Sequence, residues 1–341
     1  MPVKLRVEEL TILTNTIADE VLEFSLPQYR AELVRISYVD GWVLSLTADD
    51  ELGALESILR SMGCLRPPVS RRLFWDALTS AGVSRPPHMD ELLSLMERAT
   101  RFDPSDPRQK VLAVDTNILY NCTLTLAAGM TRSRPPIAIS GCILYEIAVK
   151  VQREMDREEA KWVRQLAGMR GSRKLGNELA RTWHLERRRG LAALREYERV
   201  KLAYPYVSTP RKKCEGDAEI ARDYSQLMAK GVNVVLVTHD KQMYSTARAH
   251  DLPVILLNPP DKKLDRVPLN YLPEFIYHLS VNFGLVRVSG KKGWAIVRSA
   301  WKGARDEEAI KGIVQVESSP EIESKISGEI EMVRAVLKEL A

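Results

Sequence analysis

The run Lys110-Val-Leu-Ala-Val-Asp115 determines the fold that we predict for the middle of the chain. It is a short apolar stretch that ends in an acid, and Thr116-Asn117 follows it. A second stretch of this kind, Asn233-Val-Val-Leu-Val-Thr238, is rich in β-branched residues and ends two residues before Asp240. Short stretches with this composition predict strands that are buried on both faces of a sheet.

Strands and helices alternate on both sides of these two runs. Two further strands are predicted at Ile137-Ala-Ile-Ser140 and Pro253-Val-Ile-Leu-Leu257. Helices are expected from near Cys142, along a long basic stretch to about Tyr204, from Asp217 to Gly231 and from Lys241 to His250. Strands that are separated by helices predict an α/β domain, with a parallel sheet between layers of helices.

The flanking segments have a different character, so we predict three parts. An α+β module covers residues 1–105, the α/β domain covers 106–262 with a basic helical insertion at about 150–210, and a C-terminal module of a β-hairpin and a helix covers 263–341. The turns at Asp40-Gly41 and at Ser289 to Gly293 each predict a hairpin. Because both end modules offer hairpins, we expect them to pack together as one β-containing platform.

Composition excludes several classes of protein. With 45% hydrophobic and 28% charged residues among 341, the chain is expected to fold and to remain in solution. No apolar stretch is long enough to span a bilayer, and the N-terminus lacks an apolar signal core, so we expect a cytoplasmic protein without a membrane partner. The cysteines form no CxxC pair, which predicts reduced thiols and no zinc site.

Positive charge is concentrated in one part of the chain. Residues 147–213 hold 18 Lys and Arg against 8 Asp and Glu, whereas residues 1–105 hold 11 against 16. A local excess of this size predicts a polyanionic partner such as RNA, because phosphate contacts dominate the affinity for nucleic acids. A solvated helical face with i,i+4 ion pairs is the alternative explanation.

Four acids are candidates for a metal site. Asp115 and Asp240 follow predicted strands, whereas Asp217 and Glu146 stand near the starts of predicted helices. In a parallel α/β sheet both kinds of position lie at the carboxyl edge, where ligands bind. A cluster of carboxylates without His or Cys suits Mg²⁺ or Mn²⁺. Asp217 and Asp240 could instead serve only as helix N-caps, and Glu146 could be an ordinary solvated helix residue.

In order and context these motifs resemble those of the PIN-domain ribonucleases over residues 110–258. The matching segments are Val114-Asp-Thr-Asn117, Glu146, Gly216-Asp-Ala-Glu-Ile220 and Val237-Thr-His-Asp240. The resemblance implies a Rossmann-like sheet and a Mg²⁺- or Mn²⁺-dependent endonuclease, which hydrolyses single-stranded or looped RNA to a 5′-phosphate and a 3′-hydroxyl. It implies metal-binding, catalytic roles for Asp115, Glu146, Asp217 and Asp240, with Asn117 and Thr238 in support; Glu154 is an alternative to Glu146.

The chain departs from the compact, toxin-like members of this family. The segment between Glu146 and Asp217 is longer and holds most of the basic charge, and the flanking modules are additional. These differences favour RNA processing or turnover over a toxin role, with the ribosome, tRNA or a second copy of the chain as further candidate partners. The alternatives are a catalytically silent RNA- or ribosome-binding protein and, less favoured, a flap-type DNA nuclease.

Two basic clusters are candidates for contact with RNA. The first combines the Arg187-Arg188-Arg189 run with Trp183, which could neutralise phosphates and stack on an unpaired base. The alternative is that Trp183 belongs to the apolar face of the helix and the arginines only solvate it. Arg211-Lys212-Lys213 is close in sequence to Asp217 and is the better candidate for a phosphate contact.

Overall fold

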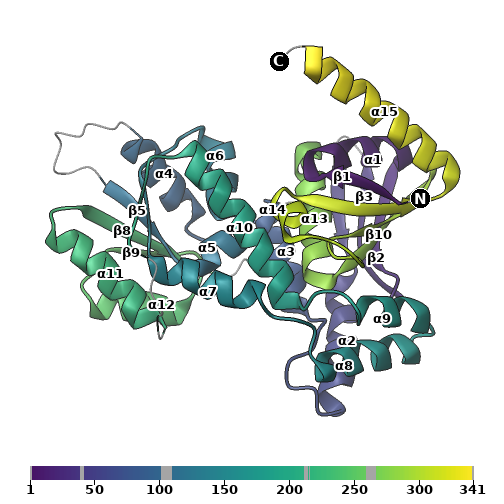
Figure 1. Cartoon of the computed structure of the whole chain (residues 1–341), viewed down its shortest axis with the longest axis horizontal. Helices are drawn as coiled ribbons and strands as arrows, with labels where there is room; N and C mark the ends of the chain where they lie inside the picture. The colour runs from purple at the N-terminus through teal and green to yellow at the C-terminus, as the bar shows by residue number, and fades with distance from the viewer. Residues whose placement is uncertain are drawn as a thin grey trace. The chain divides into compact units, whose positions relative to one another are not determined.

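A computed structural model of the chain describes residues 2–38, 42–100, 110–210, 214, 216–258 and 266–339. The chain forms two compact units, and each unit combines segments that are separate in sequence (Figure 1). Unit 1 contains Met1–Val83, Arg153–Arg188 and Leu264–Ala341, and unit 2 contains Ser84–Gln152 and Arg189–Lys263. Both units mix helices with strands, so the α/β class is confirmed at this level.

Unit 2 is built on a parallel sheet. Its strands, in spatial order, are β7 (Tyr206–Ser208), β6 (Ile137–Ile139), β5 (Lys110–Val114), β8 (Asn233–Thr238) and β9 (Val254–Leu256). Every neighbouring pair is parallel, which confirms the predicted βαβ arrangement. Most residues of β5, β6 and β8 are buried, as their apolar sequences predict.

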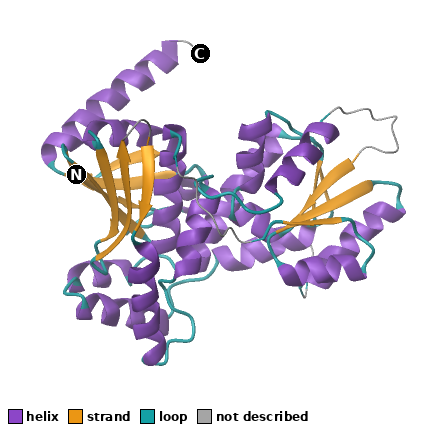
Figure 2. Ribbon diagram, turned by 180° about the vertical axis from the view of Figure 1, so that it is seen from behind, coloured by secondary structure: helices purple, strands orange, loops and turns teal. Residues whose placement is uncertain are grey.

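Helices flank this sheet (Figure 2). They are α4 (Met89–Ala99), α5 (Thr116–Tyr120), α6 (Thr123–Thr131), α7 (Gly141–Val151), the part of α10 (Leu185–Ala203) beyond Arg188, α11 (Asp217–Ala229) and α12 (Lys241–Ala249). Apolar side chains of the helices and of the strands form one continuous core. Burial of this apolar surface is the main driving force for the fold of the unit.

The order of the strands creates a switch point between β5 and β8. From β5 the chain proceeds outward to β6 and β7, and it then returns to the other side of β5 to form β8 and β9. In open parallel sheets, ligands bind beyond the carboxyl ends of the strands where the order reverses in this way. Asp115 directly follows β5 and Asp240 lies two residues beyond β8, so both acids stand at this point.

Unit 1 contains a seven-stranded antiparallel sheet that combines both ends of the chain. Its order is β1 (Val3–Arg6), β12 (Ile313–Ser318), β11 (Gly293–Arg298), β10 (Leu285–Gly290), β2 (Val21–Leu26), β3 (Ala31–Tyr38) and β4 (Trp42–Leu46). Both predicted hairpins are present as the pairs β3–β4 and β10–β11, although the Asp40-Gly41 turn lies outside the described residues. The expected common platform is therefore confirmed.

The helices of unit 1 include α13 (Leu272–Phe283), which packs against β10 and β11 of the sheet. The others are α1 (Leu10–Ile17), α2 (Ala48–Ser61), α3 (Arg71–Ser80), α8 (Arg157–Met169), α9 (Arg173–Leu179), the start of α10, α14 (Asp306–Ile310) and α15 (Pro320–Glu339), with the short 3-10 helices η1 (Val7–Glu9) and η2 (Leu269–Tyr271). Nearly every side chain of α13 is buried. A helix with so many buried side chains must be enclosed by other elements.

The boundaries of the units differ from the three parts that the sequence predicted. Residues 84–100 join unit 2, because the apolar face of α4 enters the core around β5. Residues 153–188, which we expected within an insertion of the α/β domain, belong instead to unit 1. Within the described ranges, no helix is both long and apolar enough to cross a bilayer.

Candidate functional site

Asp115 is held at the end of β5 by three hydrogen bonds. One carboxylate oxygen accepts from the Thr116 backbone N–H at 2.5 Å, and the other accepts from the Thr238 hydroxyl at 2.8 Å and from the Asn117 amide at 3.1 Å. The side chain is buried, with 3% of the residue exposed. Thr238 and Asn117 thus lie where their predicted supporting role needs them.

Asp240 approaches the same place from β8. Its backbone N–H donates to the Thr238 hydroxyl at 2.9 Å, and that hydroxyl donates to Asp115. One carboxylate oxygen of Asp240 accepts from the Gln242 backbone N–H at 2.7 Å and caps α12. One carboxylate oxygen of Asp240 therefore acts as the predicted N-cap. The Thr238 hydroxyl connects the backbone of Asp240 to the carboxylate of Asp115.

Glu146, on α7, contacts Thr116, the residue that follows Asp115. One oxygen of Glu146 accepts from the Thr116 hydroxyl at 2.7 Å, and the other accepts from Lys150 at 2.7 Å, one helical turn further along. The alternative acid, Glu154, belongs to unit 1 and pairs through its backbone with Trp183. Of the two candidates, only Glu146 belongs to the unit that carries the other three acids.

Asp217 joins these acids electrostatically. It is the first residue of α11, after Gly216, which has a φ of 100°. Burial raises the pKa of Asp217, and the negative charges of Asp240 and Glu146 raise it further. Asp217 in turn raises the pKa of Asp115. Asp217 therefore interacts electrostatically with each of the other three acids.

The described acids do not form a closed cage of ligands. The charges that shift the pKa values of Asp115 and Asp217 are all negative, so a cation between them would relieve repulsion. In the described part of the chain, no three of the four acids have oxygens all within 4.8 Å of one another.

A second group of possible ligands, in unit 1, is a poorer fit to a metal. Asp156, Glu159 and His184 place one ligand atom each within 4.8 Å of the others. The Glu186 backbone N–H donates to Nδ1 of His184 at 3.0 Å, so the ring proton is on Nε2, which lies 2.5 Å from Glu159. A metal at Nε2 would have to displace that proton while Nδ1 still accepts a hydrogen bond. The group is better explained as side chains that pair with one another at the start of α8, where Asp156 caps the helix.

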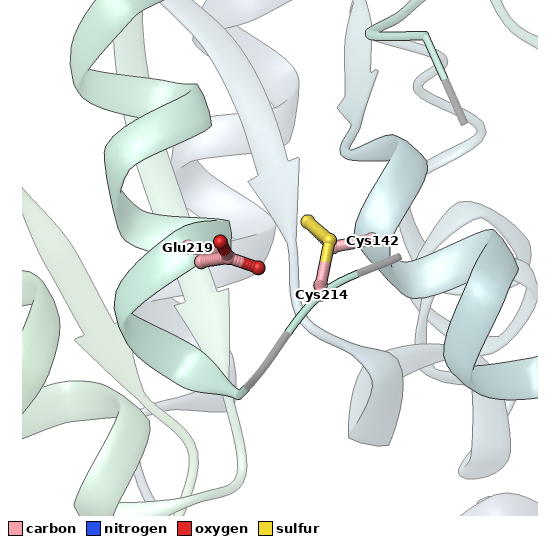
Figure 3. A group of neighbouring side chains, drawn as sticks. All are labelled: Cys142, Cys214 and Glu219. Carbon is pink, nitrogen blue, oxygen red and sulfur yellow. A yellow bond between two sulfur atoms is a disulfide. The ribbon is translucent and has the colours of Figure 1, made fainter. Parts of the chain in front are cut away.

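A disulfide joins Cys142 and Cys214 beside the acids, which corrects the prediction of reduced thiols. Their Cα atoms lie 5.4 Å apart, although 72 positions separate them in sequence (Figure 3). Cys142 stands one turn before Glu146 on α7, and Cys214 stands three residues before Asp217. Glu219 of α11 faces the bond, but paired sulfurs do not offer thiolate ligands. The disulfide therefore ties together the segments that carry two of the acids.

A small pocket adjoins the disulfide. Its volume is about 220 Å³. It is lined by both cysteines, Tyr145, Glu146, Val149, Gly216 and Ile220. Of the four acids, Glu146 is the one that contributes to its wall.

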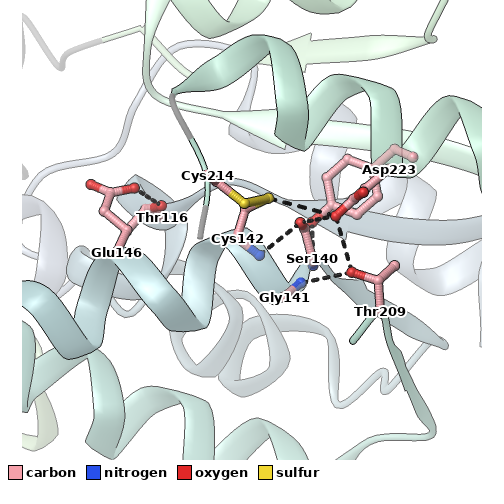
Figure 4. The surroundings of a disulfide bond; sticks show 9 residues. Thr116, Ser140, Gly141, Cys142, Glu146, Thr209, Cys214 and Asp223 are labelled. Atoms are coloured by element: carbon pink, nitrogen blue, oxygen red, sulfur yellow. Dashed lines mark hydrogen bonds between the residues drawn. A yellow bond between two sulfur atoms is a disulfide. The ribbon is translucent and has the colours of Figure 1, made fainter. Parts of the chain in front are cut away.

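Asp223, a buried acid of α11 that the sequence did not single out, hydrogen-bonds to segments beside the site. Its carboxylate accepts from the Ser140 hydroxyl at 2.6 Å and from the Thr209 hydroxyl at 3.0 Å (Figure 4). Thr209 in turn accepts from the Gly141 N–H at 2.7 Å. These contacts join the end of β6 and the start of α7 to α11. The signal in the sequence was an acid two turns after Asp217, on the helix face that also carries buried Ile220 and Tyr224.

The expected RNA-binding arginines are engaged within the protein. Arg188 is 5% exposed and donates to the carbonyls of Val281 at 2.8 Å and Asn282 at 3.3 Å, so its predicted contact with RNA is corrected. Arg187 pairs with Asp306 at 2.9 Å and lies over the Trp183 ring, 5.1 Å from its centroid. Three successive residues of a helix point in widely different directions, so they could not all face solvent.

The remaining predicted RNA contacts fall in unit 2. Arg189 is half-buried and lies 5.5 Å from the centroid of the Tyr120 ring, which Lys150 approaches to 4.6 Å. Arg211, Lys212 and Lys213 lie outside the described residues. Lys150, which was not among the predicted contacts, therefore supplies positive charge next to Glu146, and the predicted Arg189 lies against the same Tyr120 ring.

Known proteins add no further assignment. A scan against protein-family models found no match for this sequence, and a search of curated proteins found none.

Asp115 should make the stability of the protein depend on pH. Burial raises its pKa from the ordinary value of 3.8 to about 6, against the lowering effect of its hydrogen bonds. The stabilisation from protonating Asp115 is complete below 3.8 and is lost as the pH rises through about 6. In urea unfolding without divalent ions, we expect the free energy of unfolding of wild type to fall by up to about 3 kcal/mol across this window, relative to that of Asp115→Asn. Identical pH dependence in both proteins would contradict this.

Proposed function

We propose that the chain is a Mg²⁺- or Mn²⁺-dependent endoribonuclease whose unit 2 is a PIN-like domain. The single observation that carries the proposal is that hydrogen bonds through Thr238 and Thr116 bring Asp240 and Glu146 next to Asp115. The position of the acids supports the proposal as well, since they lie at the switch point of a parallel sheet. A cytoplasmic role in RNA processing or turnover remains part of this prediction.

Each residue of the cluster has a distinct proposed part. Asp115 and Asp217 would hold the ion, and Glu146 and Asp240 would complete its surroundings through waters or direct contact. The ion would supply positive charge to the phosphodiester and lower the pKa of an attacking water. Thr238 and Asn117 keep the Asp115 carboxylate oriented by donating hydrogen bonds to it. Lys150, bound to Glu146, adds positive charge where an RNA phosphate would approach.

A second candidate function is RNA or ribosome binding without catalysis. The observation that favours it is the spacing of the acids, since the described carboxylates do not converge as a ready set of direct ligands. Under this alternative, RNA would bind in the presence of chelator, and no divalent ion would produce cleavage. A flap-type DNA nuclease is less favoured, and it would prefer branched DNA over RNA.

Cleavage of end-labelled RNA tests the proposal. Wild type would be incubated with Mn²⁺, with Mg²⁺ or with EDTA on single-stranded RNA, stem-loop RNA and flap DNA. We expect internal cuts in the unpaired RNA with either ion and none in EDTA. Equal cutting in EDTA would reject the metal site, preference for the flap DNA would favour the DNA nuclease, and binding without cutting would favour the silent protein.

A further inference from the structure

A pocket with a basic rim lies in unit 1, apart in sequence from the four acids. Its volume is about 670 Å³, within the range of roughly 300–1,000 Å³ that is usual for ligand sites. All of its residues belong to unit 1. They are Lys174, Asn177 and Glu178 of α9, Arg181 and Thr182 after it, Arg298 of β11, Ala300, Trp301 and Lys302 after that strand, and Gln315 and Glu317 of β12.

The acids of this pocket are already paired. Arg298 contacts Glu317 at 3.0 Å and Glu178 at 3.5 Å, and only 11% of its side chain is exposed. This buried arginine fixes both carboxylates in the wall. The pocket therefore does not present two free negative charges to a ligand, and an incoming anion meets less repulsion than the composition suggests.

The basic side chains of the rim are available instead. Lys174, Arg181 and Lys302 are exposed, and within the described ranges they form no ion pair. They come from α9, from the segment after α9 and from the turn after β11, so three separate elements contribute positive charge to the pocket. Flexible unpaired cations around a hollow attract an anion that carries several charges in a row.

The neutral lining is suited to the rest of a nucleotide. Asn177, Thr182 and Gln315 offer amide and hydroxyl groups that can hydrogen-bond to a sugar or a base edge. Trp301 is 8% exposed, and Lys4 lies 5.5 Å from its ring centroid, so it forms a firm apolar wall rather than a free stacking platform. A wall of this kind would contact a ribose or base but would offer nothing to a carboxylate side chain.

We propose that this pocket holds a segment of single-stranded RNA, with Lys174, Arg181 and Lys302 contacting successive phosphates. The inference rests on the proposed function, because it supplies unit 1 with a role toward the same substrate. In this proposal Arg181 binds RNA. Arg187 and Arg188, which lie nearby in the arginine-rich stretch, are instead bound within the protein.

The test measures binding rather than cleavage, so that it is independent of catalysis. The full chain carrying Lys174→Gln, Arg181→Gln and Lys302→Gln would be titrated in EDTA against a fluorescein-labelled oligouridylate, by anisotropy at several salt concentrations. A matched control would carry Arg35→Gln, Arg72→Gln and Lys325→Gln, which remove the same charge from exposed positions of unit 1 outside the pocket. Thermal unfolding would verify that both triple variants fold.

We expect the pocket variant to bind roughly tenfold or more weakly, with a salt slope smaller by about two, as loss of three phosphate contacts predicts. The RNA affinity of the control variant should change far less. Equal losses in the two variants would overturn the inference, because the effect would then be net charge alone. Displacement of the RNA by uridine monophosphate at equal phosphate concentration would make the pocket a mononucleotide site, and displacement by polyglutamate would make it an acidic-protein site; either would overturn it.

The proposal for the pocket and the proposal of a nuclease can be rejected independently. Wild-type cleavage with unaltered RNA binding by the pocket variant would reject the pocket alone. Weaker binding by the pocket variant without any cleavage by wild type would keep the pocket and reject the nuclease.

Discussion

Asp115→Asn is expected to reduce Mn²⁺-dependent RNA cleavage by at least about a hundredfold, equivalent to roughly 2.7 kcal/mol of barrier. The substitution keeps the size of the side chain but removes the charge at the end of β5. It also places an amide among groups that donate to Asp115, namely the Thr116 N–H, the Thr238 hydroxyl and the Asn117 amide. Rates would be measured on the same unpaired RNA at saturating Mn²⁺.

Glu198→Gln provides the matched control for this loss of one negative charge. Glu198 is exposed on α10 and belongs to the same unit. We expect its variant to cleave like wild type. Equal cleavage by Asp115→Asn and wild type would end the enzymatic account, whereas equal losses in both variants would attribute the effect to general electrostatics.

Loss of the disulfide is expected to have the largest effect on stability. The bond closes a loop across 72 positions, for which the chain-entropy relation gives about 4 kcal/mol as an upper estimate. The double variant Cys142→Ser/Cys214→Ser should therefore unfold at a clearly lower urea concentration. Because the bond tethers the segments before Glu146 and Asp217, the variant should also bind Mn²⁺ more weakly in a calorimetric titration.

Dithiothreitol separates the bond from the substitutions themselves. Reduction during urea unfolding should lower the stability of wild type toward that of the double variant and leave the double variant unchanged. If dithiothreitol left wild type unchanged under unfolding conditions, or destabilised both proteins equally, the disulfide would not carry the predicted stability.

The fold was predictable where a local pattern forces one structure. The apolar runs of β5 and β8 and the alternation with helices sufficed for a parallel sheet, and the two hairpins sufficed for a shared platform. Several elements escaped prediction, among them β7 and α13. The exposed strand β7 has no apolar pattern, and the enclosure of α13 depends on elements from both ends of the chain.

The site was predictable only in part, for a related reason. Parallel strands align their carboxyl ends, so Asp115 and Asp240 could be placed together from sequence. Nothing local indicated that Cys142 would meet Cys214 or that Asp223 would receive the Ser140 hydroxyl, because these contacts join distant segments. Arg188 was misassigned because three adjacent arginines suggest an exposed surface, whereas the fold uses one of them to bind buried carbonyls.

The position of Mn²⁺ in a crystal of the wild-type protein, located by its anomalous scattering, tests the central claim most directly. The account predicts a peak between the carboxylates of Asp115 and Asp217, with Glu146 and Asp240 contacting the ion directly or through water. It also predicts that the peak is lost in Asp115→Asn. Absence of Mn²⁺ from this cluster at concentrations that support cleavage, or a peak only at Asp156, Glu159 and His184, would contradict it.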